Sequence, residues 1–283
     1  MAVQIGGTPI TLGSLPLSVV DDAGVTWLPT KVKGWSSPAV RAELHPRQSD
    51  HGSWASPAYL EARSIAIEGL ISAPTTAARD AAIEQLYAAV SLTDTVLVIE
   101  ETIPKQATVR RSGEVLVEPV NPYSATYSAL VTAPDPRRYS TTLQSQSTAL
   151  PSTTGGLAVP VTLPILISTS TVAGSITLLN SGTIATRPTF TLEGPVTNPT
   201  VTVQYPDGTV KALLYSSTLE VGDELVIDTD LHSAVLNGTT SRRLYVSGQW
   251  PEIPPGIAVK VGWYADSYDA NALLTGSVRS AWM

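Results

Sequence analysis

The sequence predicts a mainly β protein of two domains, and three observations support this prediction. Short apolar runs rich in β-branched residues recur along the chain, separated by turns that contain glycine or proline. A helical spacing of apolar residues is convincing in one segment alone. The chain has 283 residues, whereas single domains usually have ~100 to 200.

Composition and charge exclude several classes of function. Hydrophobic residues make up 43% of the chain and charged residues 14%, so the chain should fold. Cysteine is absent, which leaves packing and oligomerisation as sources of stability. The net charge is −7 with 17 dispersed Lys and Arg residues. A phosphate-binding basic face is therefore missing, and we expect no sequence-specific nucleic-acid binding.

Neither the first residues of the sequence nor its most apolar stretch indicates a secretion signal or a membrane span. Residues 1–13 lack a basic segment followed by an apolar one, so we expect synthesis in the cytoplasm. Residues 155–167 are too few to span a bilayer as a helix, and Pro160 and Pro164 interrupt them. We expect no membrane insertion.

The first domain is predicted over residues 1–142. Residues 15–20 and 25–28 have the pattern of a β-hairpin, and a helix is predicted between Thr75 and Leu92, with Thr75 or Thr76 as its cap. Proline-rich residues 134–139 cannot continue a central strand, so the domain should end there. The remaining predicted elements are a strand at 95–99, a hairpin of 107–111 with 114–117, and a strand at 123–131.

Residues 143–182 are predicted as an uncharged connector or arm rich in serine and threonine. A flexible linker is one interpretation. The interleaved Val, Ile and Leu favour strands, or an extended arm against a neighbouring surface.

The second domain is predicted over residues 183–283. Turns at Asp207–Gly208 and Asn237–Gly238 separate apolar runs at 201–205, 225–227, 244–246 and 259–263. Repeated short strands without helices are typical of a β-sandwich.

The titratable residues indicate no catalytic or metal site. His45, His51 and His232 lack zinc-site spacing. Adjacent acids occur at Glu100 and Glu101, at Asp223 and Glu224, and at Asp228 and Asp230. Such pairs serve glycosidases only when they flank a sugar, so we interpret them as exposed or turn acids. No catalytic residue, cofactor or metal ligand is predicted.

Aromatic residues allow three interpretations. Trp27, Trp35 and Trp54 lie in the first domain, whereas Trp250, Trp263 and Tyr264 lie late in the second. Tryptophans in β domains are most often core, but they also anchor protein interfaces or stack on sugars.

An ordered set of short motifs resembles the distal tail proteins of long-tailed bacteriophages. No motif is specific alone, but their order covers nearly the whole chain. In the first half they are Trp35–Pro38, Val40–Arg41, Arg47, His51–Gly52, Trp54, Tyr59, Arg63 and Ile65–Gly69, followed by the helix, a hairpin and Pro134–Tyr139. In the second half they are Gly155–Leu157, Pro160, Asn180–Gly182, Pro188, Glu193–Pro195, Gly222–Asp223 and Ile227–Asp228.

The resemblance implies an N-terminal split β-barrel-like domain with one helix and a C-terminal β-sandwich like galectins or carbohydrate modules. Copies of the first domain would close into a hexameric ring at the virion tail tip, leaving a channel for DNA. The implied partners are the tail tube protein, the tape measure protein, and a tail-associated hub or receptor-binding protein. The implied role is structural and not enzymatic.

Two sets of site residues follow. We expect Trp35, Arg41, Arg47 and Arg63 to contribute to the assembly interface, because arginine and tryptophan are favoured there. Trp250, Trp263 and Tyr264 are expected to contact a partner or a sugar. A carbohydrate-binding adhesin remains an alternative function, and a glycan hydrolase is a second one.

Overall fold

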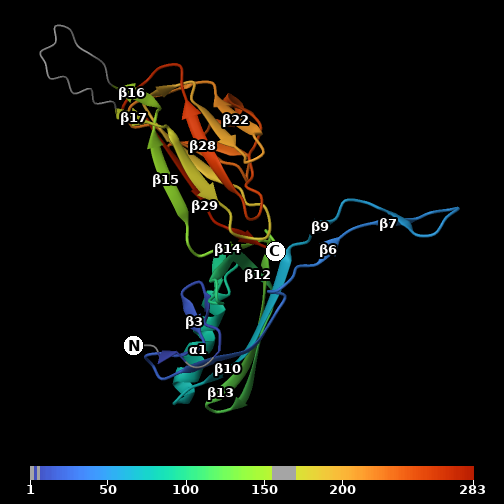
Figure 1. Cartoon of the computed structure of the whole chain (residues 1–283). Coiled ribbons are helices and arrows are strands. Elements are labelled where there is room, and N and C mark those ends of the chain that lie inside the picture. Colours follow the sequence, from blue (N-terminus) through green and yellow to red (C-terminus); the bar gives the residue numbers. More distant parts are fainter. Residues whose placement is uncertain (1–2, 5–6, 155–169) are drawn as a thin grey trace, which may run out of the picture. The chain divides into compact units, whose positions relative to one another are not determined.

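The computed structural model describes residues 3–4, 7–154 and 170–283, which form two units (Figure 1). The first unit comprises residues up to 141 together with 282–283, and the second comprises residues 142–281. Strands dominate both units, so the prediction of a mainly β protein is confirmed.

The first unit is organised around a long antiparallel sheet. The outer strands are only two or three residues long, whereas the central ones are much longer. Along this sheet the strands are β1 (Val3–Gln4), β4 (Val19–Val20), β5 (Thr26–Lys33), β10 (Arg63–Ser72), β13 (Ser124–Ala133), β12 (Lys105–Asn121), β11 (Thr95–Ile99), β2 (Ile10–Leu12) and β3 (Leu15–Leu17), with β14 (Arg138–Ser140) also paired to β12. The last strand of the chain, β30, covers Ala281–Trp282.

Alternation along the central strands creates the core of this unit. In β10, Ile65, Ile67, Gly69 and Ile71 are buried, while the residues that alternate with them are not, as expected when successive side chains point to opposite faces. The hairpin predicted around residues 21–24 is confirmed, since β4 and β5 pair antiparallel.

The predicted helix is confirmed as α1 (Thr76–Ala89). The Thr75 side chain accepts a hydrogen bond from the Ala78 backbone N–H at 3.1 Å and caps the helix. Ala82 and Leu86 are buried against the sheet core. Among the described residues, no helix is long and apolar enough to cross a membrane.

One predicted hairpin is wrong. Residues 107–117 form part of a single long strand, β12, and Ser112 and Gly113 do not reverse its direction. The register against β13 shifts between Arg111 and Val115, which marks a bulge rather than a turn. The Arg111 side chain stabilises it by donating from Nε to the Gly113 carbonyl at 2.8 Å.

The second unit contains two sheets that share one core. Phe190 and Leu192 of one sheet pack in the same buried cluster as Val201 and Val261 of the other. The six-stranded sheet contains β15 (Gln144–Ala149), β29 (Leu273–Val278), β19 (Thr189–Glu193), β24 (Glu224–Asp228), β25 (Ser233–Leu236) and β26 (Thr240–Ser241). The five-stranded sheet contains β18 (Ser175–Leu179), β28 (Ala258–Tyr264), β21 (Thr200–Gln204), β22 (Val210–Tyr215) and β27 (Val246–Gly248).

Short elements complete the second unit, and one of them corrects a prediction. Residues 244–246 are not one strand: Arg243–Tyr245 form a 3₁₀ turn, η1, and β27 begins at Val246. The two-stranded pairs are β16 (Ser152–Thr154) with β17 (Ser170–Val172), and β20 (Val196–Thr197) with β23 (Thr218–Leu219).

The segment predicted as a connector contributes strands to both sheets of the second unit. Its first part contains β15 and its last part contains β18. Ile176 and Leu178 alternate with more exposed residues and enter the core, which explains why this stretch folds with the sandwich. Residues 155–169 lie outside the described residues.

The helix packing can be tested with a matched pair of leucines. Leu86 is fully buried, whereas Leu92, just beyond the helix, is 79% exposed. We expect Leu86→Ala to lower the free energy of unfolding by ~2 to 5 kcal/mol and Leu92→Ala to change it little, as measured by denaturant unfolding. Equal effects of the two substitutions would contradict the described packing.

Candidate functional site: a projecting arm and its anchor

A long hairpin, residues 36–62, projects from the first unit and is called the arm here (Figure 1). Within the part of the chain that the structure describes, its strands pair only with one another, β6 (Val40–Arg41) with β9 (Tyr59–Leu60) and β7 (Leu44–Pro46) with β8 (Ser53–Ala55). Nearly all of its residues are exposed. The arm therefore has no core of its own.

Local hydrogen bonds and a proline give the arm its form. Pro57 lacks a backbone donor and lies in the gap between the two paired segments. Across this gap, the Ser56 backbone N–H donates to the Glu43 carbonyl at 3.0 Å, and the Glu43 N–H donates to the Ser56 hydroxyl at 2.9 Å. At the tip, the Arg47 N–H donates to the Gly52 carbonyl at 3.1 Å.

Two arginine–aromatic pairs lie along the arm. The Arg47 guanidinium lies 4.5 Å from the ring centroid of Trp54, and that of Arg41 lies 6.0 Å from the ring of Tyr59. Trp54 and Tyr59 are 65% and 59% exposed, and the side chains of Val40 and Leu44 on the same arm are exposed to a similar extent. Apolar side chains exposed on this scale are typical of a surface that another molecule covers.

Arg63 holds the base of the arm. Its side chain is fully buried, with Nε donating to the Pro136 carbonyl at 2.8 Å and Nη1 donating to the carbonyls of Gly34 and Trp35. The residues on either side of the arm are thus tied together. Burial, with a smaller effect from the nearby Arg138 charge, lowers the pKa of Arg63 to about 10.

Gly34 permits this close approach at the base of the arm. Its φ is +81°, and a Cβ atom there would lie 1.9 Å from the Ser64 carbonyl oxygen. Any side chain would therefore force the backbone at the base of the arm apart.

A second group of polar contacts surrounds Trp35. Its indole N–H donates to Glu101 Oε1 at 2.7 Å, and Lys105 binds the other carboxylate oxygen. Arg138 lies 5.4 Å from the Trp35 ring. Burial alone would raise the pKa of Glu101, but the hydrogen bonds from Lys105 and Trp35 outweigh it and lower that pKa. The Glu101 carboxylate therefore remains charged and fixes the Trp35 ring.

The structure divides the four residues that the sequence assigned to assembly. Arg41 and Arg47 lie on the arm and are accessible to a partner. Trp35 and Arg63 are 5% and 0% exposed. The prediction that they contact a partner directly is therefore corrected: both residues anchor the base of the arm. Trp54 was assigned to neither set of site residues, because a tryptophan within a β pattern is more often buried than exposed.

The aromatic residues of the second unit that were expected to contact a partner or a sugar also differ in burial. Trp263 is 2% exposed and its indole N–H donates to the Ala149 carbonyl at 3.1 Å, so it is a core residue and not a contact residue. Trp250 is partly buried, with its ring stacked 4.7 Å from that of His232. Tyr264 is 56% exposed and lies with Tyr268 beside a shallow hollow of about 80 Å³.

Two of the three acidic pairs stabilise turns, whereas Glu101 of the third binds Trp35 and Lys105. Asp228 Oδ1 accepts the backbone N–H groups of Asp230 and Leu231 at 2.8 and 3.0 Å, and Asp230 pairs with Arg187. The side-chain hydrogen bond from Asn237 lowers the pKa of Asp223. Among the residues that the structure describes, no three His, Asp or Glu side chains form a metal-binding group.

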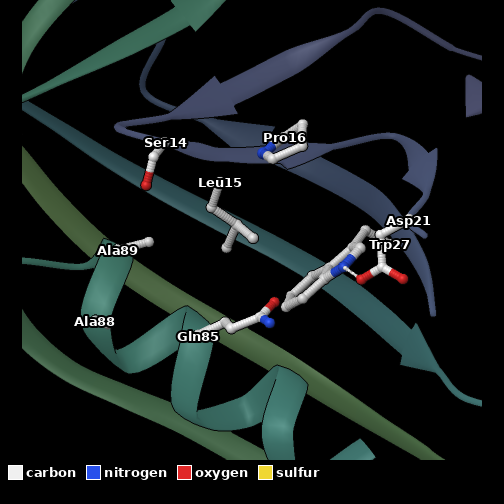
Figure 2. Close-up of a pocket in the computed structure, with 8 residues that line it drawn as sticks. All are labelled: Ser14, Leu15, Pro16, Asp21, Trp27, Gln85, Ala88 and Ala89. Atoms are coloured by element: carbon white, nitrogen blue, oxygen red, sulfur yellow. Dashed lines mark hydrogen bonds between the residues drawn. The ribbon is translucent and has the colours of Figure 1, made fainter. Parts of the chain in front are cut away.

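A pocket of about 300 Å³ opens on the first unit between β3 and the end of α1 (Figure 2). One wall is helical and largely alanine, and Trp27 donates from its indole N–H to Asp21 Oδ2 at 3.3 Å. The lining residues are Ser14, Leu15, Pro16, Asp21, Trp27, Gln85, Ala88 and Ala89.

The anchor can be tested by comparing two arginines. Arg63→Met leaves the carbonyls of Gly34, Trp35 and Pro136 without their donor, and one unsatisfied buried polar group costs ~1 to 3 kcal/mol. We expect a loss of ~2 to 4 kcal/mol in the free energy of unfolding and faster tryptic cleavage in the arm. Arg47→Met, at the exposed tip, should change the stability by less than ~0.5 kcal/mol. An equally small effect of Arg63→Met would contradict the anchoring role.

Comparisons with known proteins agree with this architecture. Residues 181–269 match the family model of the siphovirus-type tail component, C-terminal domain. The Dit protein (gp 19.1) of phage SPP1, described as a paradigm of hub adsorption apparatus in phages that infect Gram-positive bacteria, is 14% identical with a TM-score of 0.66. That match covers 98% of this chain and 100% of that one.

A second solved structure is a chain of the phage p2 baseplate in its activated conformation with Sr. It is 11% identical with a TM-score of 0.50, and the match covers 93% of this chain and 100% of that one. No curated protein matches the chain by sequence.

At these identities the two structures establish the fold, and the family match covers residues 181–269 of the second unit. The resemblance to phage distal tail proteins is thereby confirmed. Residues 181–269 match the C-terminal domain of siphovirus-type tail components, and the chain as a whole has the fold of the SPP1 Dit protein.

Proposed function

We propose that this protein forms a ring, most simply a hexamer, at the distal end of a phage tail. The ring joins the tail tube and tape measure proteins to a tail-associated hub or receptor-binding protein, and it leaves a channel for DNA. The protein is made in the cytoplasm of the bacterial host and resides at the tail tip of the virion.

The single observation that carries this proposal is the anchored, exposed arm. A free hairpin with unpaired edges and exposed apolar side chains favours association with another chain. The buried Arg63 fixes the base of the arm, so the arm is presented in a defined direction.

The arm is long enough to cross a neighbouring copy. At ~3.3 Å per residue, a fully extended strand from Trp35 to Ser49 would span roughly 45 Å. A compact domain of about 140 residues has a radius of gyration of ~14 Å, so an arm of this length would reach across such a domain.

An arm that binds a different surface of an identical copy makes a head-to-tail contact. Contacts of this kind generate rings when the rotation between copies closes, and open filaments when it does not. The distal tail fold of the chain supports the closed arrangement.

The charge of the chain suits a channel for DNA. A net charge of −7 with few basic residues disfavours phosphate binding to the wall.

The role of the arm can be tested by deletion. Lys33 and Ala66 pair across β5 and β10, so residues 38–60 can be replaced by a short Gly-Ser turn without straining the base. We expect the full chain to form closed rings in electron micrographs and native mass spectra, and the deleted chain to remain monomeric with an unchanged melting temperature. Rings formed by a folded, arm-deleted chain would contradict the proposal.

A carbohydrate-binding surface on the second unit is a second candidate function. The observation that favours it is the pair of exposed tyrosines, Tyr264 and Tyr268, which flank a hollow beside Leu150 and Pro151. Exposed aromatic rings of this kind can stack on sugars.

This second candidate predicts a local effect on glycan binding. Tyr264→Ala should weaken binding to host cell-wall glycan several-fold, whereas Tyr245→Ala, at another exposed tyrosine of the same unit, should leave it unchanged. Equal binding by the wild type and both variants in a pull-down with purified glycan would exclude the Tyr264 site.

A further inference from the structure

The tip of the arm presents a compact arginine–aromatic group, in which Arg47 also pairs with Asp50 at 3.4 Å. Trp54 is 65% exposed, with the Arg47 guanidinium 4.5 Å from its ring centroid. Stacking of this kind orients both groups while leaving much of the indole free. Tryptophan and arginine are the residues that most often dominate binding energy at interfaces.

The pocket between β3 and α1 has the form and size to receive one such side chain. Leu15, Pro16 and Ala88 give it apolar walls above the buried Trp27, and its volume of about 300 Å³ exceeds the bulk of a single indole. Ser14 and Gln85 provide oxygens that can accept the indole N–H (Figure 2).

The electrostatics of the pocket complement Arg47. Asp21 at its rim is held by the backbone N–H groups of Ala23 and Val25, each 2.9 Å from Oδ1. The adjoining end of α1 is its C-terminal, partially negative end, and the last turn of that helix contains no basic residue. A cation supplied from outside would be favoured there.

The arm cannot fill the pocket of its own copy. Figure 1 shows the arm extending away from the side of the first unit that carries β3 and α1. The occupant must therefore come from another molecule, and a second copy supplies the matching group.

We propose that Trp54 at the arm tip of one copy occupies the β3–α1 pocket of the next copy, with Arg47 facing Asp21 and the end of α1. This inference rests on the proposed ring and names the surface that receives the arm. Trp54 and the pocket lie at different places on the same chain, so the contact is head-to-tail and repeats around the ring.

Photo-crosslinking of the full chain tests this contact. With p-benzoylphenylalanine in place of Trp54, irradiation should produce covalent dimers and higher species on a denaturing gel. Tryptic mapping should place the link in residues 1–31 or 80–105 of a second copy, which contain the pocket residues.

A matched pair of pocket variants provides the control. Ala88→Trp fills the pocket and should weaken ring formation by roughly 30-fold, the effect of losing a strong interface contact. Ala81→Trp lies on an exposed position of the same helix away from the pocket and should assemble like the wild type.

The outcomes separate this inference from the proposed function. Rings seen by electron microscopy, with crosslinks that map elsewhere or with assembly unaffected by Ala88→Trp, would overturn the pocket contact and leave the ring intact. A chain that neither crosslinks nor forms rings would overturn both. Crosslinks to a protein other than a second copy would assign the arm tip to that partner instead.

Discussion

The first unit depends on a buried arginine that ties three stretches of backbone together. The arm contributes nothing to the core of the unit, so its direction is set only at its base. There Arg63 connects the carbonyls of Gly34, Trp35 and Pro136. Burying a guanidinium is costly, and the lowered pKa of Arg63 reflects that cost. A lysine has no planar fork that could reach carbonyls on both sides, which explains why arginine occupies this position.

The surrounding contacts reinforce the same joint. Glu101 accepts the Trp35 indole N–H and binds Lys105, while Arg138 lies over the Trp35 ring. Each group is oriented by at least one other, so the cluster is rigid without being apolar. A flexible hairpin would lose entropy on binding a partner, and a hairpin with a rigid base loses less of it.

Much of the fold could be predicted because local patterns and tertiary packing agree. The spacing of Leu86 and its neighbours, with Thr75 as cap, specified α1, and the turn at Asp207–Gly208 separated β21 from β22. The bulge of β12 was misread as a turn because Ser112 and Gly113 suit both structures. The sequence could not show which tryptophans are buried. Trp54 is exposed and Trp263 is buried, yet both lie in segments with a similar β pattern. Only the absence of a second layer over the arm distinguishes them.

The two units differ in which apolar and aromatic groups they leave exposed. The second unit closes its core between two sheets, and Trp263 is buried inside it. The first unit exposes the aromatic side chains of the arm and a pocket beside β3 and α1, and the proposed ring would bury both. In the proposed ring every copy makes two head-to-tail contacts, and removing one copy requires both to break. Once one contact forms, the second is intramolecular and benefits from a high effective concentration. A modest contact at each arm is therefore sufficient for a durable ring, even in a chain that has no cysteine to cross-link it.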